Sequence, residues 1–292
     1  MIISHTIGGL GNQMFQYAVG RALSLERGTP LCLDTQDFAG YSLHNGFELN
    51  RVFNISTPVA SANDLRQVLG WRSISIIRKL LLRKQLVRFR GNAMIVEPQV
   101  NYWSGIGSIP SNSYLMGYWL TEKYFKNMEE HIRLDFTFRE ALSDSNKLIA
   151  SNMQNCNSVS IHVRRGDIAQ NPDVLAVHGL CGLDYYKKAV RYIAERVQSP
   201  SFYIFSDDLK WVRDNLKINY PCYFVDQNMG QASFNDMRLM SLCKHNITAN
   251  STFSWWAAWL NNNRYKIVIS PNKWFAAQID CSDIVPSSWV RL

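Results

Sequence analysis

Short apolar strands that alternate with amphipathic helices most strongly constrain the fold of this chain of 292 residues. Near the amino terminus, residues 2–7 predict a buried strand, and a glycine-rich turn follows at 8–11. Residues 12–27 carry apolar side chains at helical spacing, and residues 30–34 predict a second strand. This order of strand, glycine turn, helix and strand is typical of the start of a parallel α/β sheet.

A second region with the same alternation begins near residue 157. Its five expected strands cover residues 159–163, 202–205, 222–225, 247–249 and 266–269. Its four expected helices cover residues 185–197 (with Asp184 as the cap), 209–216, 234–243 and 253–260. This alternation favours a doubly wound sheet, which binds ligands beyond the carboxyl ends of its strands. The Asn- and Ser-rich residues 151–158 are the expected linker, which predicts domains of 1–150 and 151–292.

Three more elements are expected in the first region. Residues 72–90 predict one basic and apolar helix, residues 114–119 a strand, and residues 121–132 a helix capped by Thr121. The six cysteines are scattered without a Cys-x-x-Cys pair, which indicates reduced thiols rather than a zinc site or a disulfide framework.

The sequence also bears on where the protein works. No targeting segment precedes the first strand, and no apolar stretch is long enough to cross a bilayer. We therefore expect a cytoplasmic protein that is soluble or peripheral at the inner face of a membrane.

The first glycine turn is a candidate ligand site. Gly9 and Gly11 allow backbone N–H groups to approach a ligand closely, and the following helix N-terminus favours an anion. The turn is not a Walker loop, and Met14 stands where a dinucleotide fingerprint needs its third glycine. Asn12 and Gln13 are poor helix formers but good hydrogen-bonding partners for a ligand. A purely structural strand-to-helix turn is the alternative.

A cluster of charged residues follows the first strand of the second region. Residues 162–167 read His-Val-Arg-Arg-Gly-Asp, and strand alternation places His162 and Arg164 on one face. Adjacent guanidinium groups of Arg164 and Arg165 suit a diphosphate, because arginine binds phosphate oxygens bidentately and stays charged. Asp167 could hold one guanidinium in place. The alternative is a surface Arg–Asp pair beside a core histidine.

Two more strands of the second region end in polar residues. One ends at Ser206, Asp207 and Asp208, where one carboxylate could bind a ribose diol or a base edge. The other carboxylate could cap the next helix, and capping alone explains one aspartate well. A third strand leads into a helix start whose hydroxyl and N–H groups could bind phosphate, at Asn250, Ser251, Thr252, Phe253 and Ser254.

These motifs, in this order, resemble the bacterial α-1,2-fucosyltransferases of glycosyltransferase family eleven. The resemblance runs from residue 3 to about 275 and rests on residues 8–18, 117–119, 122–125, 162–167, 205–208 and 250–256. It implies an α/β fold of the GT-B type, with two Rossmann-like domains facing a central cleft. Residues 1–150 would bind the acceptor and residues 151–292 would bind GDP-fucose.

The resemblance also implies the reaction. GDP-β-L-fucose would donate L-fucose, with inversion and without a metal, to the 2-hydroxyl of a terminal β-galactoside in glycan or O-antigen synthesis. GDP-fucose is a substrate, so no cofactor and no metal ligand is expected. The absence of any Asp-x-Asp in the sequence independently agrees with metal independence.

Roles for particular residues follow from the same resemblance. Arg164 would contact the β-phosphate, and Asn12 would face the fucose and the leaving phosphate. The expected catalytic residues are Arg164, His162, Asn12 and Asp167. The expected substrate-binding residues are Gly9, Gly11, Gln13, Arg165, Ser206, Asp207, Asp208, Asn250, Ser251, Thr252, Phe253 and Ser254. Asp167 and His162 are the candidates for a general base, and a dissociative mechanism would need no strong base.

The formal net charge of +8 lies in one segment. Between Asp64 and Glu97 there are eight basic residues and no acidic one, and outside this window 23 basic residues balance 23 acidic ones. The expected helix at 72–90 would be basic and amphipathic, which fits peripheral contact with anionic membrane, where a lipid-linked glycan would be found. An ordinary solvated helix is the alternative. The net positive charge therefore does not indicate a nucleic-acid partner, and we expect none.

Other functions stay open at this point. A nucleotide-dependent oxidoreductase would use Gly9, Gly11 and Asp34, but it leaves residues 162–167 unexplained. A nucleotide-sugar binding protein without catalysis is a further alternative. A fucosyltransferase of α-1,6 linkage is another, because the His-x-Arg-Arg-Gly-Asp motif recurs in α-1,6- and protein O-fucosyltransferases.

Overall fold

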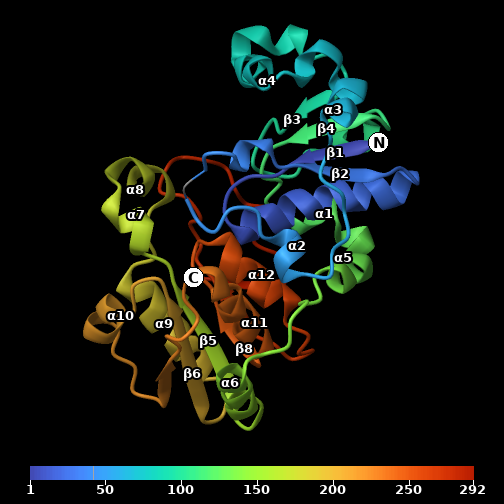
Figure 1. Cartoon of the computed structure of the whole chain (residues 1–292). Coiled ribbons are helices and arrows are strands. Elements are labelled where there is room, and N and C mark those ends of the chain that lie inside the picture. The colour runs from blue at the N-terminus through green and yellow to red at the C-terminus, as the bar shows by residue number, and fades with distance from the viewer. Residues whose placement is uncertain (42) are drawn as a thin grey trace. The chain divides into compact units, whose positions relative to one another are not determined.

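The chain folds into two compact units. The computed structural model describes residues 1–41 and 43–292, apart from the side chain of Asp167. The first unit comprises residues 1–139 with 282–284, and the second comprises residues 140–281 with 285–292. Within the described residues, each unit contains one parallel sheet flanked by helices (Figure 1). The expected α/β class is therefore confirmed.

The first unit is built on a sheet of strand order β2-β1-β4-β3. Its strands are β1 (Ile2–His5), β2 (Leu31–Asp34), β3 (Met94–Val96) and β4 (Ser113–Met116). Its helices are α1 (Leu10–Arg27), α2 (Leu49–Val52), α3 (Ala62–Leu69), α4 (Ser75–Leu81) and α5 (Glu129–Asp135). A Cβ at Gly20 of α1 would lie 2.8 Å from Leu31 Cδ1, so a small residue lets α1 approach the sheet closely.

The prediction of one long basic helix at 72–90 is wrong. The segment contains the 3₁₀ helix η2 (Gly70–Ser73), α4 and the 3₁₀ helix η3 (Lys84–Phe89). Arg90 donates from Nε and Nη2 to the carbonyl oxygens of Leu81 and Leu82, at 2.8 and 3.1 Å. A distant guanidinium thus satisfies the carbonyls at the end of α4, and the helix need not continue.

The helix expected at 121–132 is also interrupted. Two 3₁₀ turns, η5 (Glu122–Tyr124) and η6 (Lys126–Met128), precede α5. The Thr121 hydroxyl accepts the backbone N–H of Lys123 at 3.4 Å, so Thr121 caps the first of these turns rather than a long helix.

The second unit is built on a sheet of strand order β10-β9-β8-β5-β6-β7. Its strands are β5 (Asn157–Val163), β6 (Pro200–Ser206), β7 (Cys222–Phe224), β8 (His245–Ile247), β9 (Val268–Ser270) and β10 (Val290–Arg291). Its helices are α6 (Asp144–Gln154), α7 (Gly166–Gln170), α8 (Pro172–His178), α9 (Leu183–Ala194), α10 (Leu209–Asn215), α11 (Phe234–Leu242) and α12 (Thr252–Leu260). Its core includes Val159 and Ile161 from β5 and Phe202 and Ile204 from β6.

Two expectations for this unit need correction, and one strand was not expected. Residues 151–158 are not a linker, because they complete α6 and begin β5, and the units divide instead at residue 139. Gly182 rather than Asp184 occupies the N-cap of α9, and Asp184 lies in its first turn. The short strand β10 was missed because it is two residues long and carries no alternation.

Candidate functional site

Three of the sequence motifs meet at one edge of the second sheet. The strand β5 lies between β6 and β8, and all three run parallel. Val163 pairs with Ser206, so β5 and β6 end at the same level, and Ile247 at the end of β8 pairs with Ile161, two residues before the end of β5. The residues that follow each strand therefore gather at one edge, where parallel α/β sheets bind ligands.

One carboxylate organises this edge. Asp207 Oδ2 forms an ion pair with Arg164 Nη1, and Asp207 Oδ1 accepts the backbone N–H of Arg165 at 2.8 Å. The side chains of Arg164 and Asp207 are 25% and 23% exposed, so the pair remains accessible from one side. A Cβ at Gly166 would lie 2.8 Å from Asp207 Oδ2, which explains the glycine in this motif.

The carboxylate that the sequence predicts to hold a guanidinium is Asp167, and its side chain lies outside the described residues. The structure gives that contact to Asp207 instead. The sequence predicts that Asp207 or Asp208 binds the nucleoside. Asp207 has both carboxylate oxygens engaged by protein, which follows from its place directly after β6, the neighbour of β5.

The second arginine has different partners. The Arg165 guanidinium carbon lies 3.9 Å from the centroid of the Trp211 ring, and Arg165 Nε lies 3.6 Å from Asp208 Oδ2. Asp208 also accepts the N–H of Trp211 at 3.1 Å, so it caps α10, as one of the two aspartates was expected to do. A cation over an indole ring is stabilised by the ring quadrupole. Arg165 is therefore held beside α10, whereas the Arg164 guanidinium pairs with Asp207.

His162 lies near the end of β5 as a neutral, buried base. It is 6% exposed, its ring lies 5.8 Å from that of Phe253, and Nδ1 has no hydrogen-bond partner among the described residues. Burial lowers the pKa of His162 to about 4, and the positive charge of Arg164 adds to this effect while Asp207 opposes it. The imidazole is therefore uncharged near neutral pH.

The polar residues before α12 divide into two groups. Asn250 Nδ2 donates to the carbonyl oxygens of His178 and Trp274, at 2.9 and 3.1 Å, and Ser254 Oγ accepts the N–H of Ala249 at 3.2 Å. These two side chains build the turn. Ser251, Thr252 and Phe253 are half-buried at the start of α12, where hydroxyl and N–H groups can meet an anion.

The glycine turn of the first unit also divides into structural and accessible residues. Gln13 is fully buried, and its Nε2 donates to the carbonyl oxygens of Gly8 and Gly46, both at 2.8 Å. Its Oε1 accepts the N–H of Glu48 at 2.9 Å. The side chain of Gln13 therefore holds the turn together, whereas Gly9 and Asn12 are half-buried at its surface and Gly11 is buried.

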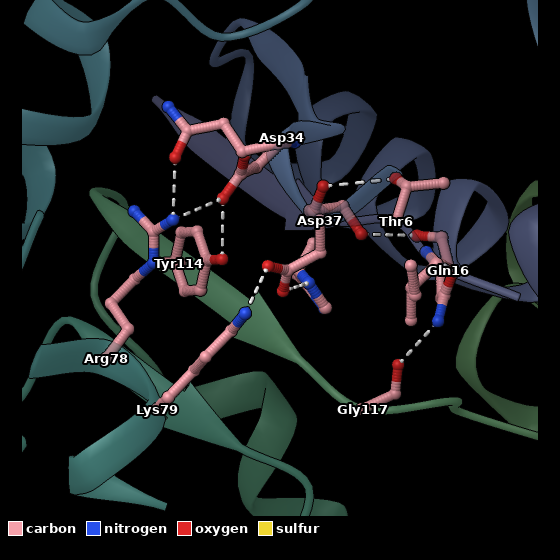
Figure 2. A network of polar contacts seen from close by, with 12 residues as sticks. Thr6, Gln16, Asp34, Asp37, Arg78, Lys79, Tyr114 and Gly117 are labelled. Atoms are coloured by element: carbon pink, nitrogen blue, oxygen red, sulfur yellow. Dashed lines mark hydrogen bonds and ion pairs between the residues drawn. The ribbon is translucent and has the colours of Figure 1, made fainter. Parts of the chain in front are cut away.

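A second glutamine joins this turn to the neighbouring strand. Gln16 Oε1 accepts the N–H of Ile7 at 3.0 Å, and Gln16 Nε2 donates to the carbonyl oxygen of Gly117 at 3.1 Å (Figure 2). The residue lies in the second turn of α1 and is fully buried. It fixes the glycine turn against the segment that follows β4, and the sequence offered no signal that separated it from Gln13.

A carboxylate that the sequence analysis missed lies beside that segment. Glu97 directly follows β3, and its two carboxylate oxygens accept the N–H groups of Tyr118 and Trp119 at 2.7 and 2.9 Å. Burial raises the pKa of Glu97 to about 7, although both N–H groups lower it. The available signal was its position as the first acid after a long acid-free segment.

The described residues contain no group of three or more His, Cys, Asp or Glu side chains that could hold a metal ion. The six cysteines are free. Metal-independent catalysis stays a prediction.

Two units with parallel sheets are the architecture of the GT-B glycosyltransferases. An α-1,6-fucosyltransferase NodZ structure, soaked with GDP-fucose, matches with a TM-score of 0.54, covering 89% of this chain and 91% of that one at 15% identity. An Arabidopsis thaliana FUT1 variant in complex with GDP matches with a TM-score of 0.53, covering 91% and 69% at 13% identity. At these identities the likeness concerns the fold.

The chain belongs to glycosyl transferase family 11, whose sequence profile matches residues 96–292. It is 36% identical to an α-1,2-colitosyltransferase of Escherichia coli, covering 100% of this chain and 99% of the relative. It is also 36% identical to the O-antigen biosynthesis glycosyltransferase WbnK of Escherichia coli, covering 98% of each. A galactoside α-(1,2)-fucosyltransferase 1 of Bos taurus is 27% identical over 87% of this chain and 64% of its own. The expected family and enzyme class are confirmed.

We expect His162 to make folding stability depend on pH. An unperturbed histidine has a pKa of 6.5, whereas the pKa of His162 in the fold is about 4, so the unfolded chain binds the proton more tightly. Stability from this group is complete above pH 6.5 and is lost as pH falls toward 4, by about 2 kcal/mol between pH 7 and pH 5. Urea unfolding of wild type and His162→Gln at both pH values isolates this contribution. An equal pH dependence of the two proteins, or an imidazole that titrates near pH 6.5 by NMR, contradicts it.

Proposed function

We propose that this protein transfers L-fucose from GDP-β-L-fucose to the 2-hydroxyl of a terminal β-galactoside, with inversion and without a metal ion. The pairing of Arg164 with Asp207 at the ends of β5 and β6 is the observation that carries the proposal. A carboxylate-held guanidinium stays charged, keeps its orientation and can offer two N–H groups to phosphate oxygens. Membership of a family that includes galactoside α-(1,2)-fucosyltransferases supports the acceptor and the linkage.

In this proposal the diphosphate leaves without help from a metal. As the bond from fucose C1 to the β-phosphate oxygen breaks, its electron pair remains on GDP, and negative charge accumulates there. Arg164 meets that charge with a fixed positive group, and the start of α12 at Ser251 and Thr252 adds N–H dipoles. Arg165, Ser206, Asp208 and Phe253 complete the proposed donor site. The acceptor oxygen forms its bond to C1 on the opposite face, which inverts the configuration.

We assign the donor to the second unit and the acceptor to the first. Arg164 and Arg165, which follow β5 at the ligand-binding edge of the second sheet, support the donor assignment. In the first unit, Asn12 and the backbone of Gly9 at the start of α1 are the proposed contacts to the transferred sugar and the leaving phosphate. Gln13, Asn250 and Ser254 act on the substrate only by shaping these turns, because their hydrogen bonds go to the protein.

A second donor has a specific observation in its favour. An α-1,2-colitosyltransferase is 36% identical over the full length of this chain. Colitose differs from fucose by the absence of the 3-hydroxyl, so both sugars suit the same diphosphate contacts. The two donors would be distinguished where the site meets O3 of the sugar.

We also propose that the acceptor is a lipid-linked glycan and that the protein works on it at the cytoplasmic face of a membrane. The similarity to an O-antigen biosynthesis glycosyltransferase supports this proposal. Across the part of the chain that the structure describes, no helix has both the length and the apolar character needed to span a bilayer.

The test measures GDP release from GDP-fucose, and from nucleotide-linked colitose, across a panel of β-galactosides in the presence of EDTA. We expect acceptor-dependent release with one donor and an α-1,2 linkage in the product. Arg164→Ala should lower kcat/KM by about 10²–10³, as for loss of one charge-stabilising donor. The matched control, Arg196→Ala, removes an exposed arginine of the same unit and should leave kcat/KM unchanged.

Three results would count against the proposal. Absence of acceptor-dependent release with both donors would refute glycosyl transfer to galactosides. An α-1,6-linked product would refute the linkage. An Arg164→Ala variant within tenfold of wild type would remove Arg164 from its role.

A further inference from the structure

In residues 70–90, one face of α4 packs against the rest of the first unit and another face is exposed to solvent. Arg78 and Leu81 are 2% and 3% exposed. Ile76 and Leu80, on a different face of the same helix, are 68% and 42% exposed. A helix on an ordinary solvated surface carries polar residues on its outer face, so the second apolar face needs an explanation.

Two of the seven bases of this segment anchor α4 to the first sheet. Arg78 Nη2 lies 3.3 Å from Asp34 Oδ2, which also accepts the Tyr114 hydroxyl at 2.8 Å. Lys79 Nζ lies 3.0 Å from Asp37 Oδ1. Figure 2 shows both basic side chains reaching from α4 to the carboxylates at and after the end of β2. Because breaking a buried ion pair is costly, the buried Arg78–Asp34 contact fixes which face of α4 points outward.

The outward side combines bases with large apolar side chains. Trp71, Val87 and Phe89 are 55%, 50% and 42% exposed, and they come from η2 and η3, the two segments that contact α4. The guanidinium groups of Arg72 and Arg88 lie 4.7 and 4.8 Å from the centroids of the Trp71 and Phe89 rings. Large apolar side chains exposed together on neighbouring elements favour an interaction site.

The bases of this side have no acidic neighbours along the chain. Residues 65–96 contain no Asp or Glu. Arg83, Lys84 and Arg88 are exposed, and within the described residues no ion pair involves them. Their charge is therefore available to an external anionic partner.

We propose that the exposed side chains of residues 71–89, here called the docking surface, bind an anionic phospholipid membrane. Apolar and aromatic side chains flanked by Lys and Arg suit the interface of a bilayer, where apolar groups enter the acyl boundary and bases meet lipid phosphates. Nucleic acid would use the bases but leave Ile76, Leu80 and Val87 in water. The proposal concerns a surface, so it stands independently of the sugar that the enzyme transfers.

The test is co-sedimentation of the full chain with phosphatidylcholine vesicles, with and without phosphatidylglycerol. We expect binding that requires phosphatidylglycerol and falls at least tenfold in Arg83→Gln/Lys84→Gln/Arg88→Gln, since each base near the surface contributes. Ile76→Ser/Leu80→Ser should weaken it as well. Lys187→Gln/Lys188→Gln/Arg191→Gln, which removes three exposed bases of α9, is the matched control and should bind as wild type.

Loss of binding in the control equal to that in the first variant would show a general charge effect and overturn the docking surface. So would a wild type that ignores phosphatidylglycerol, or an apolar variant that binds as wild type. Transfer to a soluble galactoside should be unchanged in all variants. That measurement separates failure of the docking surface from failure of the proposed function.

A different observation concerns Glu97. Its carboxylate lies at the carboxyl end of β3 and binds the N–H groups of Tyr118 and Trp119 after β4. A Cβ at Gly117 would lie 2.4 Å from Glu97 Cβ, so the glycine permits this close contact. The carbonyl of Gly117 is in turn tied by Gln16 to the glycine turn. Glu97 therefore belongs to the same edge of the first sheet as the proposed sugar-binding residues.

The backbone beside Glu97 is strained. Trp119 has a φ of 57°, in the left-handed region that non-glycine residues avoid, and its buried Nε1 has no hydrogen-bond partner among the described residues. Such strain persists where the surroundings impose it, and it is frequent at functional sites. Each Glu97 oxygen accepts one N–H and keeps a lone pair, and the side chain is only partly buried.

We infer that Glu97 is the general base that accepts the proton of the acceptor hydroxyl; this inference rests on the proposed function. The acceptor O–H bond breaks as its oxygen bonds to the sugar C1, the proton passes to the Glu97 carboxylate, and the bond from C1 to the β-phosphate oxygen breaks with its electron pair leaving on GDP. The pKa of about 7, raised by burial, suits a base that works near neutral pH.

The pH profile of Glu97→Gln tests this role. In wild type, kcat/KM should fall below about pH 7 as the carboxylate is protonated. In Glu97→Gln, kcat should drop about 10²–10⁴-fold and the acidic limb should vanish. Formate should partly restore the activity of Glu97→Ala, which a merely structural role would not permit. Glu130→Gln, at an exposed position of α5, is the matched control and should keep the wild-type profile.

An unchanged acidic limb in Glu97→Gln, or no rescue of Glu97→Ala, would overturn the assignment. Slow hydrolysis of GDP-fucose to GDP without acceptor should persist in Glu97→Gln, because it needs only the donor site. A wild type that transfers no sugar would instead refute the proposed function.

Discussion

The carboxylate of Asp207 is the contact on which the candidate site depends. It follows β6, yet its two oxygens bind the Arg164 guanidinium and the Arg165 backbone N–H, both of which follow β5. Two strand ends are thereby joined, and the first arginine is kept in one orientation. A side chain at position 166 would clash with the Asp207 carboxylate, so the same contact requires the glycine of the motif. A diphosphate would thus meet a positive charge already in place, which is what electrostatic catalysis requires.

The polar residues around the proposed site have two kinds of task. Gln13, Gln16 and Asn250 direct their hydrogen bonds to backbone groups of the protein and shape the turns. Arg164 lies just after the end of β5, and Thr252 and Asn12 lie at the starts of α12 and α1, on the outer side of these turns. The buried, neutral His162 is better suited to packing beside Phe253 than to accepting a proton, and Glu97 has the higher proton affinity.

Local patterns predicted most strands and the long helices, because the run of apolar residues that predicts such an element, as in β5 and β6, lies within the segment itself. The break at the end of α4 could not be predicted, since it depends on Arg90 reaching carbonyls of Leu81 and Leu82. The motifs identified Arg164 as the diphosphate-binding candidate, but they could not identify Asp207 as its partner, because that pairing depends on strand order. Asn12 and Gln13 are adjacent amides in one turn, and the sequence did not indicate that Gln13 is buried whereas Asn12 is only half-buried. Glu97 was missed because its partners lie about twenty residues away in sequence, in the segment that follows another strand.

Calorimetric binding of GDP and of GMP to wild type and Arg164→Ala, in EDTA, is the decisive measurement for the role of this arginine. GMP lacks the β-phosphate but keeps the nucleoside. If Arg164 binds the β-phosphate, its removal should weaken GDP binding about 10- to 100-fold, as for a lost charge-assisted hydrogen bond, and leave GMP binding unchanged. Equal losses for the two nucleotides, or no loss for GDP, would contradict the claim that this arginine holds the departing diphosphate.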